Sequence, residues 1–213
     1  MMDLKSTDKV LVHACCAPCS GAILEWLVGQ GVRPTVFFSN ANIYPLAEYE
    51  LRRGELLRYA AQLGQKAASS GQEPKGLVVI DDVYDHEAWR YAVRGLECEP
   101  ERGQRCLQCF RFRLERAARY AHEHGFNVLT TTLASSRWKD LEQVDAAGAY
   151  ACSLFPGLRW WGRNWRKGGL QERRSAIIRE QNFYNQTWCG CEFSHHDKTN
   201  EPTCPLPVEA PSR

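Results

Sequence analysis

Seven of the ten cysteines in this chain fall into three short groups that suit metal binding or redox chemistry. The groups are Cys15-Cys16-x-x-Cys19, Cys106-x-x-Cys109 and Cys189-Gly-Cys191. A 213-residue chain that begins without an apolar leader is not typical of a secreted disulfide framework. Adjacent cysteines such as Cys15 and Cys16 also seldom form a relaxed disulfide with each other. Metal binding or redox chemistry is therefore the preferred interpretation.

Two of these groups offer four sulfur ligands from separate segments. Cys106 and Cys109 are three residues apart at the start of an expected helix, so their sulfurs share one side of it. Cys15 and Cys16 follow an expected strand, and the two segments can meet at one edge of a sheet. Four such thiols suit a structural zinc ion or a [4Fe–4S] cluster, and adjacent cysteines make a poor zinc knuckle, which favours the cluster. Nearby arginines are expected to favour the thiolate form of the second pair: Arg102, Arg105, Arg111 and Arg113.

The Cys189-Gly-Cys191 group is predicted to have a different role. Two thiols separated by one glycine are close enough to cycle between a dithiol and a disulfide. The small ring would be strained, and strain makes a disulfide easier to reduce. The alternatives are two further metal ligands or two buried apolar thiols.

A basic, tryptophan-rich segment lies in the last third of the chain. Between Arg159 and Arg179 there are seven Lys or Arg residues and one acidic residue, Glu172. Basic residues interleaved with aromatic ones are typical of phosphate contacts combined with base stacking. The predicted nucleic-acid contacts are Trp160, Trp161, Arg163, Arg166 and Lys167. The alternative is a solvated charged face whose tryptophans belong to the core.

The elements that must position these groups alternate between strand and helix. Strands are expected at residues 10–14, 35–43 (with a polar loop), 75–81 and 127–133, and helices at 20–27, 46–64 and 106–125. This alternation predicts an α/β fold with an open, mostly parallel, Rossmann-like sheet flanked by helices, followed by a Trp/Arg-rich C-terminal extension. In such sheets ligands gather at the carboxyl ends of the strands, where the first cysteine group is expected.

Three regions are expected along the chain. They are an α/β thiol-rich domain at 1–158, the basic aromatic segment with the Cys-Gly-Cys group packed on the same domain at 159–196, and a flexible tail at 197–213. The apolar stretches are too short to span a bilayer and the mean hydropathy is −0.47. The expectation is a soluble, cytoplasmic protein with no membrane partner.

Six segments, taken in their order along the chain, resemble the QueH family of epoxyqueuosine reductases. They are VHACCAPCS, NANIYPLAEYELR, EPERGQRCLQCFRFRL, TTTLASSRWKD, WRKGGLQERRSAIIRE and FYNQTWCGCEFS. Each motif alone is weak, and the specificity lies in their joint order from about Leu11 to Ser194.

The resemblance implies an iron–sulfur enzyme that reduces epoxyqueuosine at the wobble position of tRNA to queuosine, using an electron donor that the sequence does not identify. It implies that Cys15, Cys16, Cys106 and Cys109 bind a [4Fe–4S] cluster and that Cys189 and Cys191 are redox-active. Some family members hold an additional iron with cysteine and aspartate ligands. Cys19 stands where some members have that aspartate, so the ligands of a second iron stay open here.

Reduction of an epoxide also needs a proton donor. Asp85 and Asp140 are the expected general acids, and the alternative is that they cap helices or form salt bridges. Two rival functions remain. One is a non-catalytic, zinc-stabilised RNA-binding module, and the other is a nucleotide-dependent tRNA-modifying enzyme, against which the lack of a glycine-rich phosphate loop argues.

Overall fold

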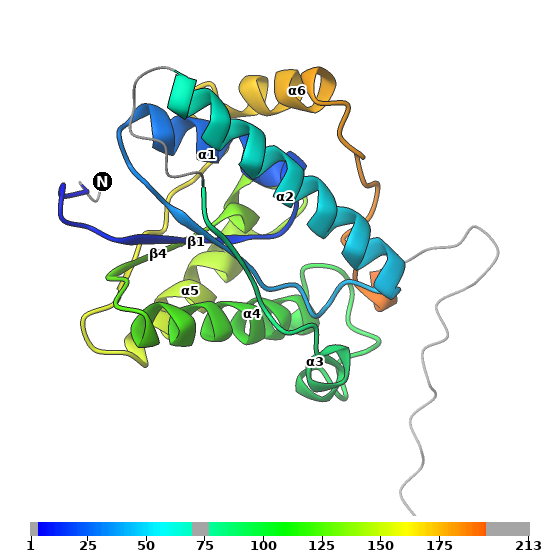
Figure 1. Ribbon diagram of the computed structural model, residues 1–213. Coiled ribbons are helices and arrows are strands. Elements are labelled where there is room, and N and C mark those ends of the chain that lie inside the picture. Colours follow the sequence, from blue (N-terminus) through cyan, green and yellow to red (C-terminus); the bar gives the residue numbers. More distant parts are fainter. Residues whose placement is uncertain (1–3, 70–76, 195–213) are drawn as a thin grey trace, which may run out of the picture.

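A five-stranded sheet forms the centre of the protein (Figure 1). The computed structural model describes residues 4–69 and 77–194, so the tail expected at 197–213 lies outside the described residues. The strands are β1 (Val10–Ala14), β2 (Thr35–Phe38), β3 (Val79–Asp81), β4 (Val128–Thr131) and β5 (Arg159–Trp160). Every neighbouring pair is parallel, in the order β3-β2-β1-β4-β5. The predicted α/β fold with a parallel, Rossmann-like sheet is confirmed.

The direction of winding changes between β1 and β4. The chain moves outward from β1 through β2 to β3, and then returns to β4 on the other side of β1. In open α/β sheets the crevice at the carboxyl ends of the two strands flanking this switch is the usual ligand site. Cys15 follows β1 directly, and the 3-10 turn η1 (Thr132–Ser135) follows β4 directly.

Helices cover both faces of the sheet (Figure 1). Those on one face are α1 (Ala17–Gly29), α2 (Leu46–Ser69) and α6 (Leu170–Glu180), and those on the other are α4 (Gln104–Glu123) and α5 (Leu141–Ser153). The short α3 (His86–Ala92) packs beside α4, and a second 3-10 turn, η2 (Glu192–Ser194), ends the described chain. All five residues of β1 and all four of β4 are buried, as expected for central strands covered on both sides.

The first cysteines are held by the start of α1. Pro18 stands in the first turn of α1, where its missing N–H costs no helical hydrogen bond. The hydroxyl of Ser20 donates to the carbonyl of Cys16 at 2.7 Å, which closes this turn. The sequence Cys-Cys-Ala-Pro-Cys therefore folds into a tight strand-to-helix junction with three thiols on it.

Four elements were not expected: α3, α5, α6 and β5. The two-residue β5 pairs with β4 and α6 covers one face of the sheet, so the basic aromatic segment contributes a strand and a helix to the α/β layers. Across the described residues, no helix combines the length and the apolar character needed to cross a bilayer.

Candidate functional site: a thiol-lined cavity at the switch point

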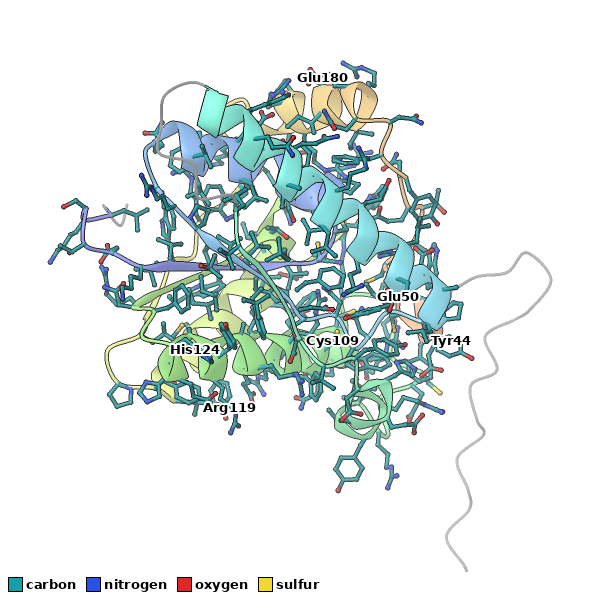
Figure 2. The ribbon with its side chains drawn as sticks, in the orientation of Figure 1. Tyr44, Glu50, Cys109, Arg119, His124 and Glu180 are labelled. Carbon is teal, nitrogen blue, oxygen red and sulfur yellow. The ribbon has the colours of Figure 1, made fainter. Side chains whose placement is uncertain are left out.

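A cavity of about 910 Å³ opens at the carboxyl ends of the strands. Seven cysteines line it: Cys15, Cys16, Cys19, Cys106, Cys109, Cys189 and Cys191. They come from three segments that are far apart in the sequence, as expected from their grouping. In Figure 2, Cys109 and His124 mark opposite ends of α4, so the thiols of α4 lie at its N-terminal end.

The first group converges most closely. The sulfurs of Cys15, Cys16 and Cys19 all lie within 4.8 Å of one another, and the Sγ atoms of Cys15 and Cys16 are 3.8 Å apart. The amide of Gln186 donates to Cys16 Sγ at 2.8 Å, and the hydroxyl of Thr132 donates to Cys15 Sγ at 3.5 Å. Residues from two distant segments, the turn η1 and the loop after α6, therefore fix these sulfurs.

The three sulfurs of this triad differ in how readily they ionise. Hydrogen bonds from Cys16 and Cys19 hold the pKa of Cys15 well below the ordinary thiol value, and the cations Lys139 and Arg113 act in the same direction. The same hydrogen bonds raise the pKa of Cys16 and of Cys19. Cys15 is therefore the thiolate of the triad, with two thiols donating to it.

Cys106 and Cys109 line the same cavity but lie outside the group of sulfurs that converge within 4.8 Å. Burial raises the pKa of Cys106 to about 11 and also raises the pKa of Cys109. Arg105 lowers the pKa of Cys106 and Arg113 lowers that of Cys109, in the expected direction, but burial raises both pKa values by more. The loss of hydration outweighs the cations: Arg105 and Arg113 donate chiefly to backbone carbonyls or an amide, and Arg111 stacks on Tyr150.

Cys189 and Cys191 occupy a loop that lines the cavity and are both free thiols. Cys191 bridges Ile43 in an antiparallel pair, and the guanidinium of Arg52 donates to the carbonyl of Cys189 at 2.9 Å. Between them, Gly190 has a φ of 100°, and an added Cβ would lie 2.9 Å from the Arg52 side chain. Glycine is therefore required between the two cysteines both by backbone conformation and by space.

The two thiols of this loop differ in protonation. Burial raises the pKa of Cys191, and the neighbouring charge of Cys189 adds to this effect. Burial would also raise the pKa of Cys189, but Lys139 and Arg113 outweigh it and lower that pKa. The ammonium of Lys139 lies 3.5 Å from Cys189 Sγ. The loop thus presents, beside a cation, a thiol whose pKa is lowered and, two residues further on, a thiol whose pKa is raised.

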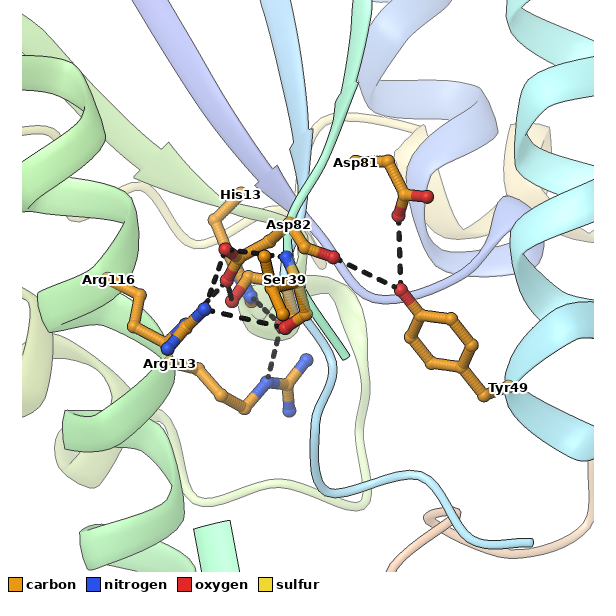
Figure 3. A network of polar contacts seen from close by, with 8 residues as sticks. His13, Ser39, Tyr49, Asp81, Asp82, Arg113 and Arg116 are labelled. Carbon is orange, nitrogen blue, oxygen red and sulfur yellow. Dashed lines mark hydrogen bonds and ion pairs between the residues drawn. The ribbon is translucent and has the colours of Figure 1, made fainter. Parts of the chain in front are cut away.

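A polar network behind the cavity fixes Arg113 (Figure 3). The Nε of Arg113 donates to the carbonyl of Ser39 at 3.2 Å, and His13 Nε2 contacts the same carbonyl at 3.1 Å. The hydroxyl of Ser39 donates to Asp82, which also accepts two hydrogen bonds from Arg116. Burial lowers the pKa of His13 to about 3, so His13 is neutral and donates through Nε2. Arg113 is thereby a fixed cation at the floor of the cavity.

The two aspartates expected to act as acids both cap helices. Asp85 accepts a hydrogen bond from the Ala88 amide as the N-cap of α3, and it is not among the residues that line the cavity. Asp140 lines the cavity and accepts hydrogen bonds from the amides of Glu142 and Gln143 as the N-cap of α5. Capping accounts for both carboxylates, and their role as acids stays a prediction.

The residues expected to contact nucleic acid have varied positions. Trp161 is 4% exposed and packs in a cluster with Trp26 and Trp165, whereas Trp160 is half-buried against Gly148 of α5. The three basic residues expected to contact nucleic acid also differ. Arg163 stacks on Trp26, Arg166 donates to backbone carbonyls, and Lys167 is exposed. Base stacking by the two tryptophans finds no support in this packing.

Several cavity residues carry no signal in the sequence strong enough to predict a role. Gln186, Arg52 and Lys139 act on the sulfurs or their backbone only because the fold brings them there. Trp138 lies at the cavity rim and is 68% exposed, and it belongs to the SRWKD motif already noted. A tryptophan between two basic residues, Arg137 and Lys139, was the one sequence signal that could have marked it.

The donor set fits a metal group bound through sulfur. Three convergent sulfurs, four further thiols and a cationic surround match the soft ligands and charge compensation that thiolate-bound metals need. Buried side-chain atoms that lack partners among the described residues also face this region, including Gln186 Oε1 and Arg174 Nε. Fold and site together define an α/β protein with a thiol-lined, cation-rich cavity, suited to a metal, at the switch point of a Rossmann-order sheet.

Known proteins share this sequence over most of its length. The family described as epoxyqueuosine reductase QueH matches residues 10–197. Proteins named epoxyqueuosine reductase QueH from Histophilus somni and Acinetobacter baylyi are 43% and 42% identical over 190 and 192 residues, covering 89% and 90% of this chain and 73% and 83% of theirs. The protein of that name from Thermotoga maritima is 30% identical, over 87% of this chain and 89% of its own. The chain belongs to the QueH family, as its motifs predicted.

Proposed function

We propose that this protein reduces epoxyqueuosine to queuosine at the wobble position of tRNA. The observation that carries the proposal is the meeting of seven cysteines, all within motifs of the QueH resemblance, at one cavity. The reaction is inferred from the names of the relatives, and the cavity is where we propose that it takes place. Its volume lies in the range of small-molecule sites, and it is large enough to admit a single nucleoside.

Cys15, Cys16, Cys106 and Cys109 would hold a [4Fe–4S] cluster, and Cys19 is the candidate ligand for an additional iron. When bound, such a group supplies single-electron transfer and Lewis acidity. The buried cations that surround the thiols would offset its negative charge. The rival group is zinc, which the same sulfurs also suit.

The overall reaction adds two electrons and two protons to the epoxide, breaks its C–O bonds and releases water. Cys189 and Cys191 would provide the two electrons by forming one disulfide. The lowered pKa of Cys189 and the raised pKa of Cys191 favour a reaction in which Cys189 enters as the thiolate and Cys191 as the thiol, and oxidation of that form releases one proton, from Cys191 Sγ. A second proton is needed, and a separate electron donor must then reduce the disulfide before the next turnover.

Lys139 is placed to supply that second proton. Loss of hydration alone would lower the pKa of Lys139, but the charges of Cys189 and Cys15 outweigh it and raise that pKa. Once Cys189 enters a disulfide, its charge is gone while the loss of hydration remains, so Lys139 becomes a stronger acid. Proton release from Nζ is thus tied to oxidation of the pair.

The experiment combines metal analysis with nucleoside analysis. Protein purified without oxygen should contain about four acid-labile sulfides and four irons for the cluster, and one more iron where the additional site is filled. It should convert epoxyqueuosine to queuosine in tRNA, as read by mass spectrometry of the digested nucleosides. Zinc without sulfide, together with RNA binding and no conversion, would instead establish the zinc-stabilised RNA-binding module.

Variants test the roles within the cavity. Cys189→Ser and Cys191→Ser should each abolish multiple turnover. Lys139→Met should slow a single turnover of pre-reduced protein, and Lys139→Arg, which keeps the charge but holds its proton more tightly, should not restore the rate. Full turnover by either serine variant would exclude the redox pair.

A further inference from the structure

Of the seven tryptophans, all of which lie in described residues, only Trp138 is exposed. Its indole is 68% accessible and stands at the rim of the thiol-lined cavity. The guanidinium carbon of its neighbour Arg137 lies 5.0 Å from the ring centroid. A large apolar ring paired with a cation and kept in water at the mouth of a site is a feature of surfaces that bind unstacked bases.

The backbone that carries this ring is held from two sides. Arg102 Nε donates to the carbonyl of Trp138 at 2.9 Å, and Arg166 Nη2 donates to the carbonyls of Ser136 and Lys139 at 2.6 and 2.7 Å. Arg102 itself has a φ of 68°, a conformation that costs free energy for a residue with a side chain. Its carbonyl accepts from Gln143 at 2.7 Å, which holds it there. The ring is therefore presented by a braced loop.

The excess of positive charge in and around the cavity favours a negatively charged partner. Seven Lys or Arg residues and two acidic residues line the cavity. Arg102 and Arg137 are both exposed at the rim, where phosphates can reach them. A positively charged groove with an aromatic platform is the arrangement that proteins use for single-stranded nucleic acid.

We infer that Trp138 is a stacking platform for the base that neighbours the reacting nucleotide in the tRNA anticodon loop. A nucleotide that enters the cavity leaves the stack of its loop, so its neighbour loses a stacking partner. Trp138 replaces that partner, and Arg137 and Arg102 contact the adjoining phosphates. The inference rests on the proposed function and adds a positioning residue to it.

Binding of an anticodon stem-loop RNA tests this directly. Trp138→Ala should weaken its Kd by roughly 5- to 150-fold, the range expected for loss of one base–aromatic stack. Trp138→Phe should keep most of the affinity because it keeps a ring. The salt dependence should be unchanged in Trp138→Ala, whereas Arg137→Ala should reduce its slope by about 0.7 for each lost phosphate contact.

Tyr91 provides a matched control. It is 71% exposed and has Arg94 5.0 Å from its ring centroid, but it lies on α3 away from the cavity lining. Tyr91→Ala should leave the Kd unchanged. Melting temperatures of all variants should match the wild type, which excludes misfolding as a cause.

A fluorescent base gives an independent readout. 2-Aminopurine placed on either side of the wobble nucleotide should be quenched on binding to wild-type protein at one of the two positions, and not on binding to Trp138→Ala. Equal Kd values and equal quenching for Trp138→Ala and wild type would overturn the inference. If wild-type protein still reduced epoxyqueuosine in that case, the proposed function would stand without it; if wild type neither bound nor reduced the RNA, both would fall.

Discussion

Replacing Gly148 with alanine tests whether Trp160 is a packing residue of the fold. Gly148 lies in α5, and the indole of Trp160 packs directly against it. Trp160 belongs to the adjoining edge strand β5. A Cβ added at Gly148 would stand 2.3 Å from two atoms of that ring and 2.4 Å from a third. Ordinary carbon contacts are about 3.5–4.0 Å, so the ring would have to move by more than about 1 Å. A hydrogen bond of 3.3 Å from its Nε1 to Asp145 opposes that movement.

The magnitude follows from two opposed terms. Overpacking of this kind costs about 1–3 kcal/mol, and the change from glycine to alanine inside a helix returns up to about 1 kcal/mol. We expect Gly148→Ala to lower the free energy of unfolding by about 1–2 kcal/mol. For a chain of this size that is a fall in Tm of about 2–8 °C.

Gly54→Ala is the control, because it makes the same chemical change in α2 where an added Cβ meets nothing within 4 Å. It should raise Tm by about 1–4 °C. The assay is thermal unfolding followed by circular dichroism on both variants. A Gly148→Ala protein that melts at or above the wild type would refute the packing of Trp160 described here and return that ring to the candidates for base stacking.

Three further outcomes are expected. Lys139→Gln should raise the pH midpoint for alkylation of Cys189 by iodoacetamide, because the thiolate loses a cation 3.5 Å away. Peptide mass spectrometry measures the alkylated fraction at each pH, and an unchanged midpoint would contradict the interaction between Lys139 and Cys189. Cys152→Ala should keep its full iron content, since Cys152 is buried in α5 and is not among the cavity-lining residues; loss of iron would show that a ligand has been misplaced. Arg166→Met should speed amide hydrogen exchange across residues 136–139 by about tenfold or more, because the loop loses the hydrogen bonds that Arg166 donates to its carbonyls. Unchanged exchange rates would mean that Arg166 does not stabilise that loop.

Periodicity and cysteine spacing predicted the main features of the fold. The expected first strand, residues 10–14, has the observed bounds of β1, and the alternation of strands and helices predicted the parallel sheet. Three of the four elements that escaped prediction have weak local signals. The strand β5 has two residues, the helix α3 has seven, and α6 has a polar sequence with only two buried residues, Leu170 and Ile177. Such elements form because the rest of the fold holds them.

The site was predictable as a set of thiols but not as a charge distribution. Spacing groups the cysteines, yet it does not show that Cys15 is ionised while Cys106 keeps its proton. That difference depends on which groups are desolvated and where Lys139 and Arg113 come to lie, and both are properties of the folded chain. The same limit applies to the tryptophans. Local charge does not reveal that Trp161 is buried while Trp138 stands in water.

The arginines of the site divide by depth into two kinds, and this division is compatible with the proposal that one cavity holds the thiols and receives an RNA substrate. Arg52, Arg105 and Arg113 are at most 4% exposed and donate to backbone carbonyls of the segments that carry or adjoin the cysteines. Because these three arginines are buried, they fix the walls of the cavity and compensate the negative charge of the thiolates. They are not free to follow a mobile ligand. Arg102 and Arg137 are exposed at the rim, where a phosphate can be met in water at little desolvation cost. Arg102 and Arg137 can therefore bind a polyanionic substrate at the rim, while the charge balance at the sulfurs inside the cavity stays unchanged.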